Sequence, residues 1–194
     1  MEPADAIRAA RRRHGLAESD PAHKLPAYRG RIGPLPAARR RAFMRHLAEE
    51  IADAFARPAH RPQETPLPAP EAARAGACCA CCRGQCCAHG EEHAYLDADT
   101  IRRMRAAEPG LTRAAIVARY RAKLTGERYE GSCVFHGAAG CVLDRSMRGD
   151  LCNSFLCNDV KAALRHSGPA LLVARDEEAI RRIAVYRPEP AAKG

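Results

Sequence analysis

Residues 78–87 read Cys-Cys-Ala-Cys-Cys-Arg-Gly-Gln-Cys-Cys, and this stretch determines how the rest of the chain is interpreted. Ten cysteines occur in the 194 residues, and those outside this stretch follow it as Cys133, Cys141, Cys152 and Cys157. Thiolates bind soft metals tightly, so thiols at short spacings are typical of zinc sites and iron–sulfur clusters. The two groups of cysteines therefore predict a metal site.

The first group contains two overlapping Cys-x2-Cys pairs. In Cys79-x2-Cys82 the thiolates can face one metal across a tight turn, a spacing shared by zinc knuckles and iron–sulfur loops. Cys78-x2-Cys81 offers the same spacing one residue earlier. One site cannot use both pairs and also take in the cysteines that follow, so the sequence leaves open which pair binds.

The doublet Cys86-Cys87 comes after a flexible bend at Arg83-Gly84, which lets the chain return a third thiolate to the metal. Adjacent residues of a helix or a strand point in different directions. The doublet therefore serves two ligand sets, or one of its members packs against the protein.

The later cysteines are separated by seven, ten and four residues, intervals too long for one zinc knuckle. Such intervals suit a loop that closes over a site begun elsewhere. Cys152 and Cys157 flank the start of a predicted helix, where backbone N–H groups stabilise a thiolate. We expect the two groups of cysteines to converge in space.

Three histidines lie near the cysteines, namely His89, His93 and His136. Imidazole is a common zinc ligand, but a histidine beside a cysteine cluster can also lie outside the coordination shell or on the surface. We take His93 as the candidate ligand among them.

The cysteines have two other interpretations, buried free thiols and disulfides. Ten cysteines in two spaced groups favour ligands over core packing. Disulfides would require export, and the first residues contain no apolar signal segment. No stretch approaches the ~20 apolar residues of a membrane helix. We expect a cytoplasmic protein without a membrane partner, in a reducing compartment where thiols stay free.

Composition gives the remaining limits. The chain carries 32 Lys+Arg against 23 Asp+Glu, a net charge of +9, and the excess is spread along the sequence. A spread excess is typical of a solvated surface. Aromatic residues make up 5% and tryptophan is absent, so nucleic-acid binding lacks a stacking platform and ranks last. A metal could cross-link the small core that this composition predicts.

The predicted fold class is mainly α with a small β element (α+β), with irregular cysteine-rich loops wrapped around one or two metal sites. We expect a basic N-terminal arm with an amphipathic helix (1–57), a proline-rich linker (58–75), a cysteine-cluster domain (76–187) and a disordered tail (188–194). Residues 1–35 read as weakly structured. Phe43, Leu47 and Ile51 recur every four residues and predict a helix over 37–56, whose apolar face packs in the core or binds a partner.

Further helices are predicted from capping residues. Asp97 or Asp99 begins one that ends near residue 107, and Thr112 begins another that ends at Gly126. A third runs from 153 or 154 to about 166, with Phe155 facing inward. A strand follows at 171–173, and 183–186 is a second strand unless 176–178 begins a helix.

The cysteine pattern resembles that of the YkgJ-type cysteine-cluster family. The resemblance covers residues 76–160 and rests on Cys79-x2-Cys82-x3-Cys86-Cys87, Cys133-Val-Phe-His136, Gly140-Cys141-Val-Leu143, Arg145-Ser-Met-Arg148 and Cys152-Asn-Ser-Phe155-x-Cys157. The chain departs from the family by one extra residue before the doublet, by the additional Cys78 and Cys81, and by Met147 where proline is usual.

The resemblance implies a zinc- or iron-chelating protein, and some members are described as iron–sulfur oxidoreductases. One relative is a flagellin lysine methylase. The ligands that it implies are Cys79, Cys82, Cys86, Cys87, Cys133, Cys141, Cys152 and Cys157. Cys78, Cys81 and His93 are further candidates.

Thiolate ligation is compatible with iron–sulfur, iron and zinc, and we favour an iron–sulfur cluster or iron over zinc because of the doublet. The expected function is a metal-binding protein with a redox or metal-handling role and an unknown protein or redox partner. If it is an enzyme, it is an iron–sulfur oxidoreductase or a component of an iron–sulfur-dependent modification enzyme. The alternative is a zinc-stabilised structural or interaction module.

Overall fold

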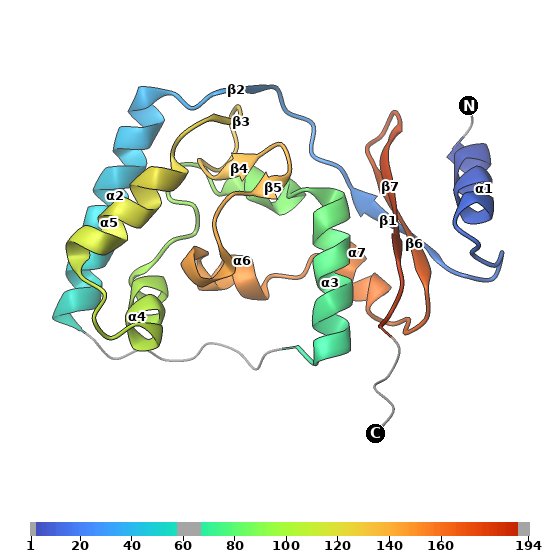
Figure 1. The fold of residues 1–194 in the computed structure, drawn as a ribbon. Coiled ribbons are helices and arrows are strands. Elements are labelled where there is room, and N and C mark those ends of the chain that lie inside the picture. Colours follow the sequence, from blue (N-terminus) through green and yellow to red (C-terminus); the bar gives the residue numbers. More distant parts are fainter. Residues whose placement is uncertain (1–2, 58–66, 190–194) are drawn as a thin grey trace. The chain divides into compact units, whose positions relative to one another are not determined.

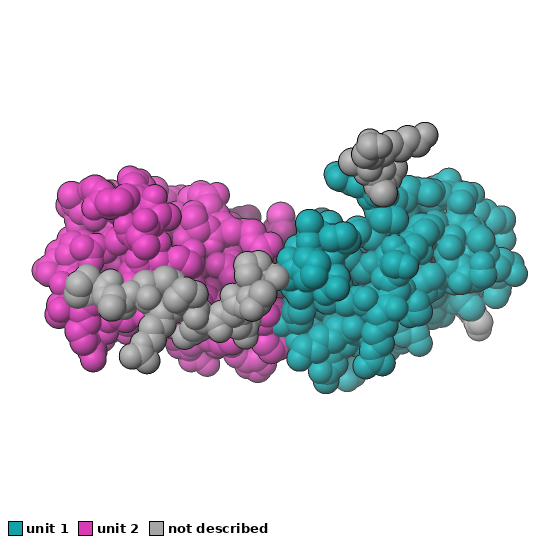
Figure 2. All heavy atoms as spheres, turned by 90° about the horizontal axis from the view of Figure 1, so that it is seen from below, with its two compact units in different colours: residues 1–29, 66–85, 156–194 teal, residues 30–65, 86–155 magenta. Residues whose placement is uncertain are grey.

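The structure is a computed structural model that describes residues 3–57 and 67–189 (Figure 1). Helices predominate and the strands form small sheets, so the predicted mainly α fold with a small β element is confirmed. The chain divides into two compact units, coloured in Figure 2. Unit 1 comprises residues 1–29, 66–85 and 156–194, and unit 2 comprises 30–65 and 86–155.

Unit 1 is built on a three-stranded sheet in the order β1-β6-β7. Strand β6 pairs in parallel with β1 and antiparallel with β7. Its elements are α1 (Pro3–Arg13), β1 (Ala22–Pro26), α3 (Ala69–Cys82), α7 (Asn158–Ala163), β6 (Ala170–Arg175) and β7 (Ile180–Tyr186).

Both faces of the central strand β6 are covered. Leu171 and Val173 are buried with Ala10 of α1, whereas Leu172 and Ala174 are buried with residues of α3 and α7. Because side chains alternate along a strand, this pattern places helices on opposite faces of the sheet. Unit 1 therefore has three layers, with α1 on one face and α3 with α7 on the other.

Unit 2 is mainly helical, with two small two-stranded sheets, β2-β3 and β4-β5. Its elements are β2 (Ile32–Pro34), α2 (Ala37–Ala56), α4 (Ala98–Ala107), α5 (Arg113–Lys123), β3 (Glu127–Tyr129), β4 (His136–Gly137), β5 (Gly140–Cys141), the short 3-10 helix η2 (Arg145–Met147) and α6 (Asp150–Ser154). Helices α2, α4 and α5 surround the main core.

The core of unit 2 centres on three aromatic rings. Phe43 lies 4.8 Å from Phe135 and 5.7 Å from Tyr120, measured between ring centroids. Phe43, Leu47 and Ile51 are all buried, as their spacing predicted. The apolar face of α2 therefore packs in the core. Within the described ranges, no helix combines the length and apolarity needed to cross a bilayer.

The predicted caps of α4 and α5 are confirmed. Asp97 Oδ1 accepts a hydrogen bond from the backbone N–H of Thr100 at 2.8 Å, and the Thr112 side chain accepts from the N–H of Ala115. Each cap satisfies a backbone donor that the first turn of a helix leaves without a partner.

Replacing Asp97 by Ala should lower the free energy of unfolding by about 1 kcal/mol, because the cap of α4 is lost. Asp97→Asn keeps an acceptor oxygen at the same place and should stay close to the wild type. Urea unfolding of the two variants measures the difference. Equal stabilities would show that the side-chain cap contributes nothing.

The predicted domain boundaries differ from the observed units. Residues 1–35 are not weakly structured, since they form α1, β1 and β2. The predicted cysteine domain, 76–187, is divided between both units, with breaks at 85/86 and 155/156. The cause is long-range pairing, because β1 finds its partner β6 at the far end of the chain.

The predicted linker also contains a helix. Its residues 58–66 lie outside the described part, but α3 begins at Ala69 and has Pro70 in its first turn. Proline is tolerated there because the first N–H groups of a helix have no intrahelical partner. The predicted tail falls mostly outside the described part, with residues 188 and 189 in no regular element.

The helix predicted from 153 or 154 to about 166 is interrupted. The chain forms α6 and α7 with a break at residues 155–157, and Phe155 is 48% exposed instead of facing inward. Residues 180–186 form a strand, as one of the two alternatives predicted.

Candidate functional site

None of the ten cysteines, all of which lie in the described part of the chain, forms a disulfide, and each unit contains five of them. Unit 1 contains Cys78, Cys79, Cys81, Cys82 and Cys157. Unit 2 contains Cys86, Cys87, Cys133, Cys141 and Cys152, which we call the unit 2 thiol cluster. Each unit thus combines cysteines from the first group with cysteines from the second.

The unit 2 thiol cluster is electrostatically coupled. A negative charge on Cys86, Cys133 or Cys141 raises the pKa of Cys87, and charges on Cys86 and Cys141 also raise the pKa of Cys152. Such coupling requires the sulfur atoms to lie near one another. The doublet therefore lies within electrostatic range of Cys133, Cys141 and Cys152.

Backbone hydrogen bonds connect the doublet to Cys133. The carbonyl oxygen of Cys87 accepts from the N–H groups of Gly90 at 3.0 Å and Cys133 at 3.1 Å, and from the Ser132 hydroxyl at 3.0 Å. Gly90 is needed here, since a Cβ at this position would lie 2.9 Å from the Cβ of Cys133. The turn that carries the doublet is thereby fixed against the segment that carries Cys133.

The loop between Cys141 and Cys152 is held through its carbonyl groups, each of which accepts a hydrogen bond from a side chain. These bonds join Arg148 Nε to Leu143 O at 2.9 Å, Asn153 Nδ2 to Arg145 O at 3.0 Å, Arg103 Nη1 to Ser146 O at 3.0 Å, the Tyr120 hydroxyl to Met147 O at 2.6 Å and Arg103 Nη2 to Arg148 O at 2.6 Å. The loop therefore has a defined path.

Arg103 has a further role, because its Nε donates to Asp150 Oδ1 at 2.6 Å. Asp150 opens α6, the helix that carries Cys152. Arg148 hydrogen bonds to the thiol of Cys141 and, as a cation beside it, lowers the pKa of that thiol. One arginine thus positions a cysteine-bearing helix, and the other lies against a sulfur atom.

Burial keeps most of these thiols neutral in the absence of a cation. It is the main cause that raises the pKa of Cys133 and of Cys152, each to about 12, and it also raises the pKa of Cys141. Within the doublet, a hydrogen bond between the thiols lowers the pKa of Cys86 to about 6 and raises that of Cys87. Cys86 is therefore the thiol that ionises first.

Residues 91–95 form a strained segment beside the cluster. Glu91, Ala94 and Tyr95 have φ angles of 38°, 54° and 53°, which L-residues rarely adopt. Strain of this kind costs of order 1 kcal/mol per residue and is concentrated at functional sites. Burial, followed by the charges of Cys152 and Cys86, raises the pKa of Tyr95, which places its phenol near the thiols.

The three histidines have different surroundings. The backbone N–H of Tyr95 donates to His93 Nδ1 at 3.0 Å, so this nitrogen supports the strained segment. His136 is fully buried and its Nδ1 lies 2.7 Å from the Ser132 hydroxyl oxygen. His89 is exposed. His93 therefore stays a predicted ligand, and only its Nε2 atom would be available to bind a metal.

In unit 1, four of the five cysteines lie on α3, so the expected tight turn between Cys79 and Cys82 is wrong. Cys78, Cys81 and Cys82 share the face of α3 that is buried with Val160 of α7, whereas Cys79 is exposed. Burial raises the pKa of Cys78 to about 12. Cys157 precedes α7, and its charge also raises the pKa of Cys78, so the two thiols are neighbours.

The donor set fits a soft metal, since five thiols gathered in a half-buried place are the ligands that zinc and iron–sulfur clusters take. Their present rotamers do not form a coordination shell. Within residues 3–57 and 67–189, no three His, Cys, Asp or Glu side chains are arranged to hold a metal ion. Binding would therefore require the thiol side chains to turn toward a common point.

Tyr95 and Arg103 belong to this site but are not predictable from the sequence. No local pattern in the sequence indicates the left-handed backbone of the segment that carries Tyr95. Arg103 lies on a helix remote in sequence from the loop that it holds. A scan against models of protein families found no match, and neither did searches of curated proteins and of solved structures.

Proposed function

We propose that unit 2 binds a soft metal centre, an iron–sulfur cluster or iron, with zinc as the alternative, through its thiol cluster. The observation that carries the proposal is the gathering of five coupled thiols from four separate segments of the chain. Free cysteines that served only as small hydrophobic residues would have no reason to collect beside one another.

The electrostatics support a cation at this place. Thiols that raise the pKa of one another stay protonated, because neighbouring thiolates repel. A bound metal cation reverses this preference and deprotonates its ligands. The guanidinium group of Arg148 at Cys141 offsets part of the negative charge of a thiolate centre.

Cys133, Cys141 and Cys152 would supply three thiolates, and the doublet would supply one or two. Cys86 is exposed and has the lowered pKa, so it is the first ligand to capture metal. A bound iron–sulfur centre would supply electron transfer, and zinc would supply a rigid cross-link. Arg103 and the backbone of residues 91–95 would orient the thiols in either case.

In unit 1, Cys79, Cys82 and Cys157 remain predicted ligands from the family resemblance. Cys82 is buried and Cys79 is exposed on the same helix, three residues apart. Residues three apart on a helix have neighbouring side chains, so Cys79 and Cys82 could bind the same metal. We assign the primary site to unit 2, because its thiols are the more strongly coupled set.

The proposal is tested on full-length protein purified without oxygen. We expect a brown protein that contains iron and acid-labile sulfide. If zinc is the native metal, a colourless protein should contain zinc in a stoichiometric amount. At neutral pH, adding zinc to metal-free protein should release about one proton for each ligating thiol other than Cys86. Raised pKa values keep Cys87, Cys133, Cys141 and Cys152 protonated beforehand, whereas the pKa of Cys86 is lowered to about 6. Calorimetry in buffers of different ionisation enthalpy counts these protons.

Changing each cysteine of unit 2 in turn locates the site. A protein that contains neither metal, and that binds zinc without proton release, would contradict the proposal. Retention of metal by a variant lacking Cys133, Cys141 and Cys152 together would place the centre in unit 1 instead.

A further inference from the structure

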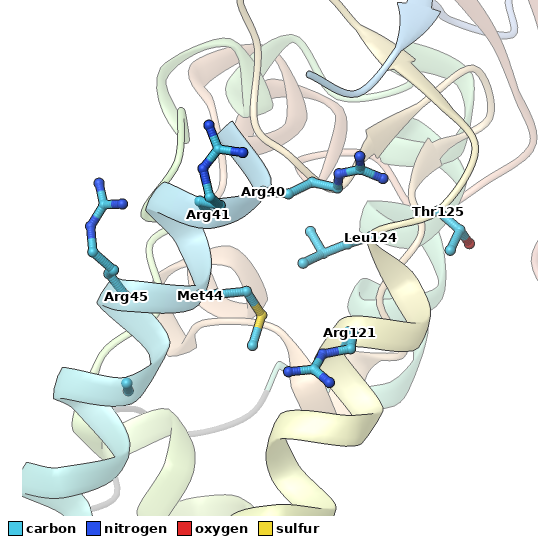
Figure 3. Close-up of a pocket in the computed structure, with 8 residues that line it drawn as sticks. Arg40, Arg41, Met44, Arg45, Arg121, Leu124 and Thr125 are labelled. Carbon is cyan, nitrogen blue, oxygen red and sulfur yellow. The ribbon is translucent and has the colours of Figure 1, made fainter. Parts of the chain in front are cut away.

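Helices α2 and α5 of unit 2 enclose a groove, and none of the cysteines of the proposed metal site lines it. The groove has a volume of about 590 Å³. It is lined by Arg40, Arg41, Met44, Arg45 and Ala48 of α2 and by Arg121, Leu124 and Thr125 at the end of α5 (Figure 3).

Four of the lining residues are arginines, and within the described part of the chain none of them has an ion pair. Other arginines of unit 2 are paired. Arg102 contacts Asp53 and Asp99, and Arg119 contacts Glu108. The groove therefore gathers positive charge that the fold does not use internally.

The position of these arginines reduces the stability of α2. The first turn of this helix contains no acidic residue, and Arg40 lies there, followed at once by Arg41. The positive end of the helix dipole disfavours cations by about 0.3–1 kcal/mol each. Arg41 and Arg45, four residues apart, add repulsion between like charges. A loss of helix stability of this kind is explained if the arginines bind a partner molecule.

The floor of the groove is apolar. In Figure 3 the side chain of Met44 points across the gap toward α5, and Arg40 and Arg121 point into the same gap from opposite sides. Leu124 is buried at 3% exposure and closes the floor. Methionine is flexible and polarizable, so it adapts to an incoming apolar side chain.

These features select one class of partner. No aromatic residue lines the groove, so a single-stranded nucleic acid would find no stacking platform. Phosphate groups would bind the arginines but would gain nothing from contact with an apolar floor. A helix with an apolar stripe flanked by carboxylates would place the stripe on Met44 and its acidic residues against the guanidinium groups.

We propose that the groove between α2 and α5 binds an acidic amphipathic helix of a partner protein. The proposal does not rest on the metal site, because no cysteine lines the groove. The arginines attract the acidic helix over a distance and orient it in the groove. The apolar floor contacts its apolar stripe, which an anion without such a stripe could not provide.

The test uses the full-length protein and a fluorescein-labelled synthetic helix with a leucine stripe between two rows of glutamate. Fluorescence anisotropy should show saturable binding to the wild type. Arg40→Glu/Arg121→Glu should weaken binding at least about tenfold, and Arg40→Gln/Arg121→Gln less so. Arg12→Glu/Arg13→Glu on α1 changes the net charge equally, far from the groove in sequence, and should change the affinity less than about twofold.

Peptide variants distinguish the two components of the surface. A peptide with the leucines replaced by serine should bind about tenfold more weakly, and one with lysine for glutamate should not bind. The proposal is overturned if the wild type does not bind the first peptide, or if both double charge reversals weaken it equally. It is also overturned if a labelled single-stranded DNA binds more tightly than the peptide and is lost with Arg40→Glu/Arg121→Glu. Circular dichroism confirms that each variant is folded.

Discussion

Replacing Cys152 by Ala is expected to remove most of the metal-dependent stabilisation of unit 2 while leaving the metal-free protein almost unchanged. The residue as a whole is exposed, although protein atoms around its sulfur raise the pKa of the thiol, and the thiol donates a long hydrogen bond to Ala94 O at 3.8 Å. A surface substitution of this kind changes stability by less than about 0.5 kcal/mol. A metal present at 1,000 times its Kd stabilises a protein by about 4 kcal/mol, and loss of a ligand removes most of that.

Thermal and urea unfolding of wild type and variant, each with and without metal, separate these contributions. Leu151→Ala is the matched control, because Leu151 precedes Cys152 on α6 and is 48% exposed. It should keep the full metal-dependent shift. Wild-type metal content and an unchanged shift in Cys152→Ala would remove this residue from the ligand set.

Gly149→Ala is expected to lower the free energy of unfolding by about 3 kcal/mol, the upper part of the range for overpacking. A Cβ at Gly149 would lie 2.2 Å from the carbonyl oxygen of Tyr95 and 2.9 Å from its carbonyl carbon. Both are backbone atoms, so rotation of a side chain cannot relieve the clash. The strained segment of residues 91–95 or the start of α6 must move, and both lie at the thiol cluster.

Gly110→Ala provides the matched control. A Cβ at Gly110 would meet nothing within 4 Å, so this variant should stay within about 0.5 kcal/mol of the wild type. Urea unfolding measures both, and metal content reports whether the cluster is disturbed in Gly149→Ala. If the two variants unfold at the same urea concentration, the close approach of Gly149 to Tyr95 is wrong.

Elements with local signals were predictable from the sequence. Helices α2, α4 and α5 show apolar spacing, and the last two have capping residues that act within one turn. The elements that were missed depend on distant partners. β1 reads Ala-His-Lys-Leu-Pro, which has little strand propensity, and it becomes a strand only by pairing with β6.

The candidate site divides in the same way. Residue type and spacing predicted that cysteines from both groups come together, because closely spaced thiols are typical metal ligands. The cysteine spacing did not reveal that Cys79 and Cys82 lie on a helix. Pro68 and Pro70 are typical of a linker, but they mark the first turn of α3, the helix that carries both cysteines. Tyr95 is placed at the site by a left-handed backbone, and Arg103 is placed there by tertiary packing. Neither feature leaves a pattern in the local sequence.

The parallel pairing of β1 with β6 sets the order in which the chain can mature on the ribosome. β1 leaves the exit tunnel early, but its partner, Ala170–Arg175, is translated only after every residue of unit 2. Unit 2 can therefore fold while β1 is still without its partner strand. A chain released before residue 170 would contain all of unit 2 and an unpaired β1.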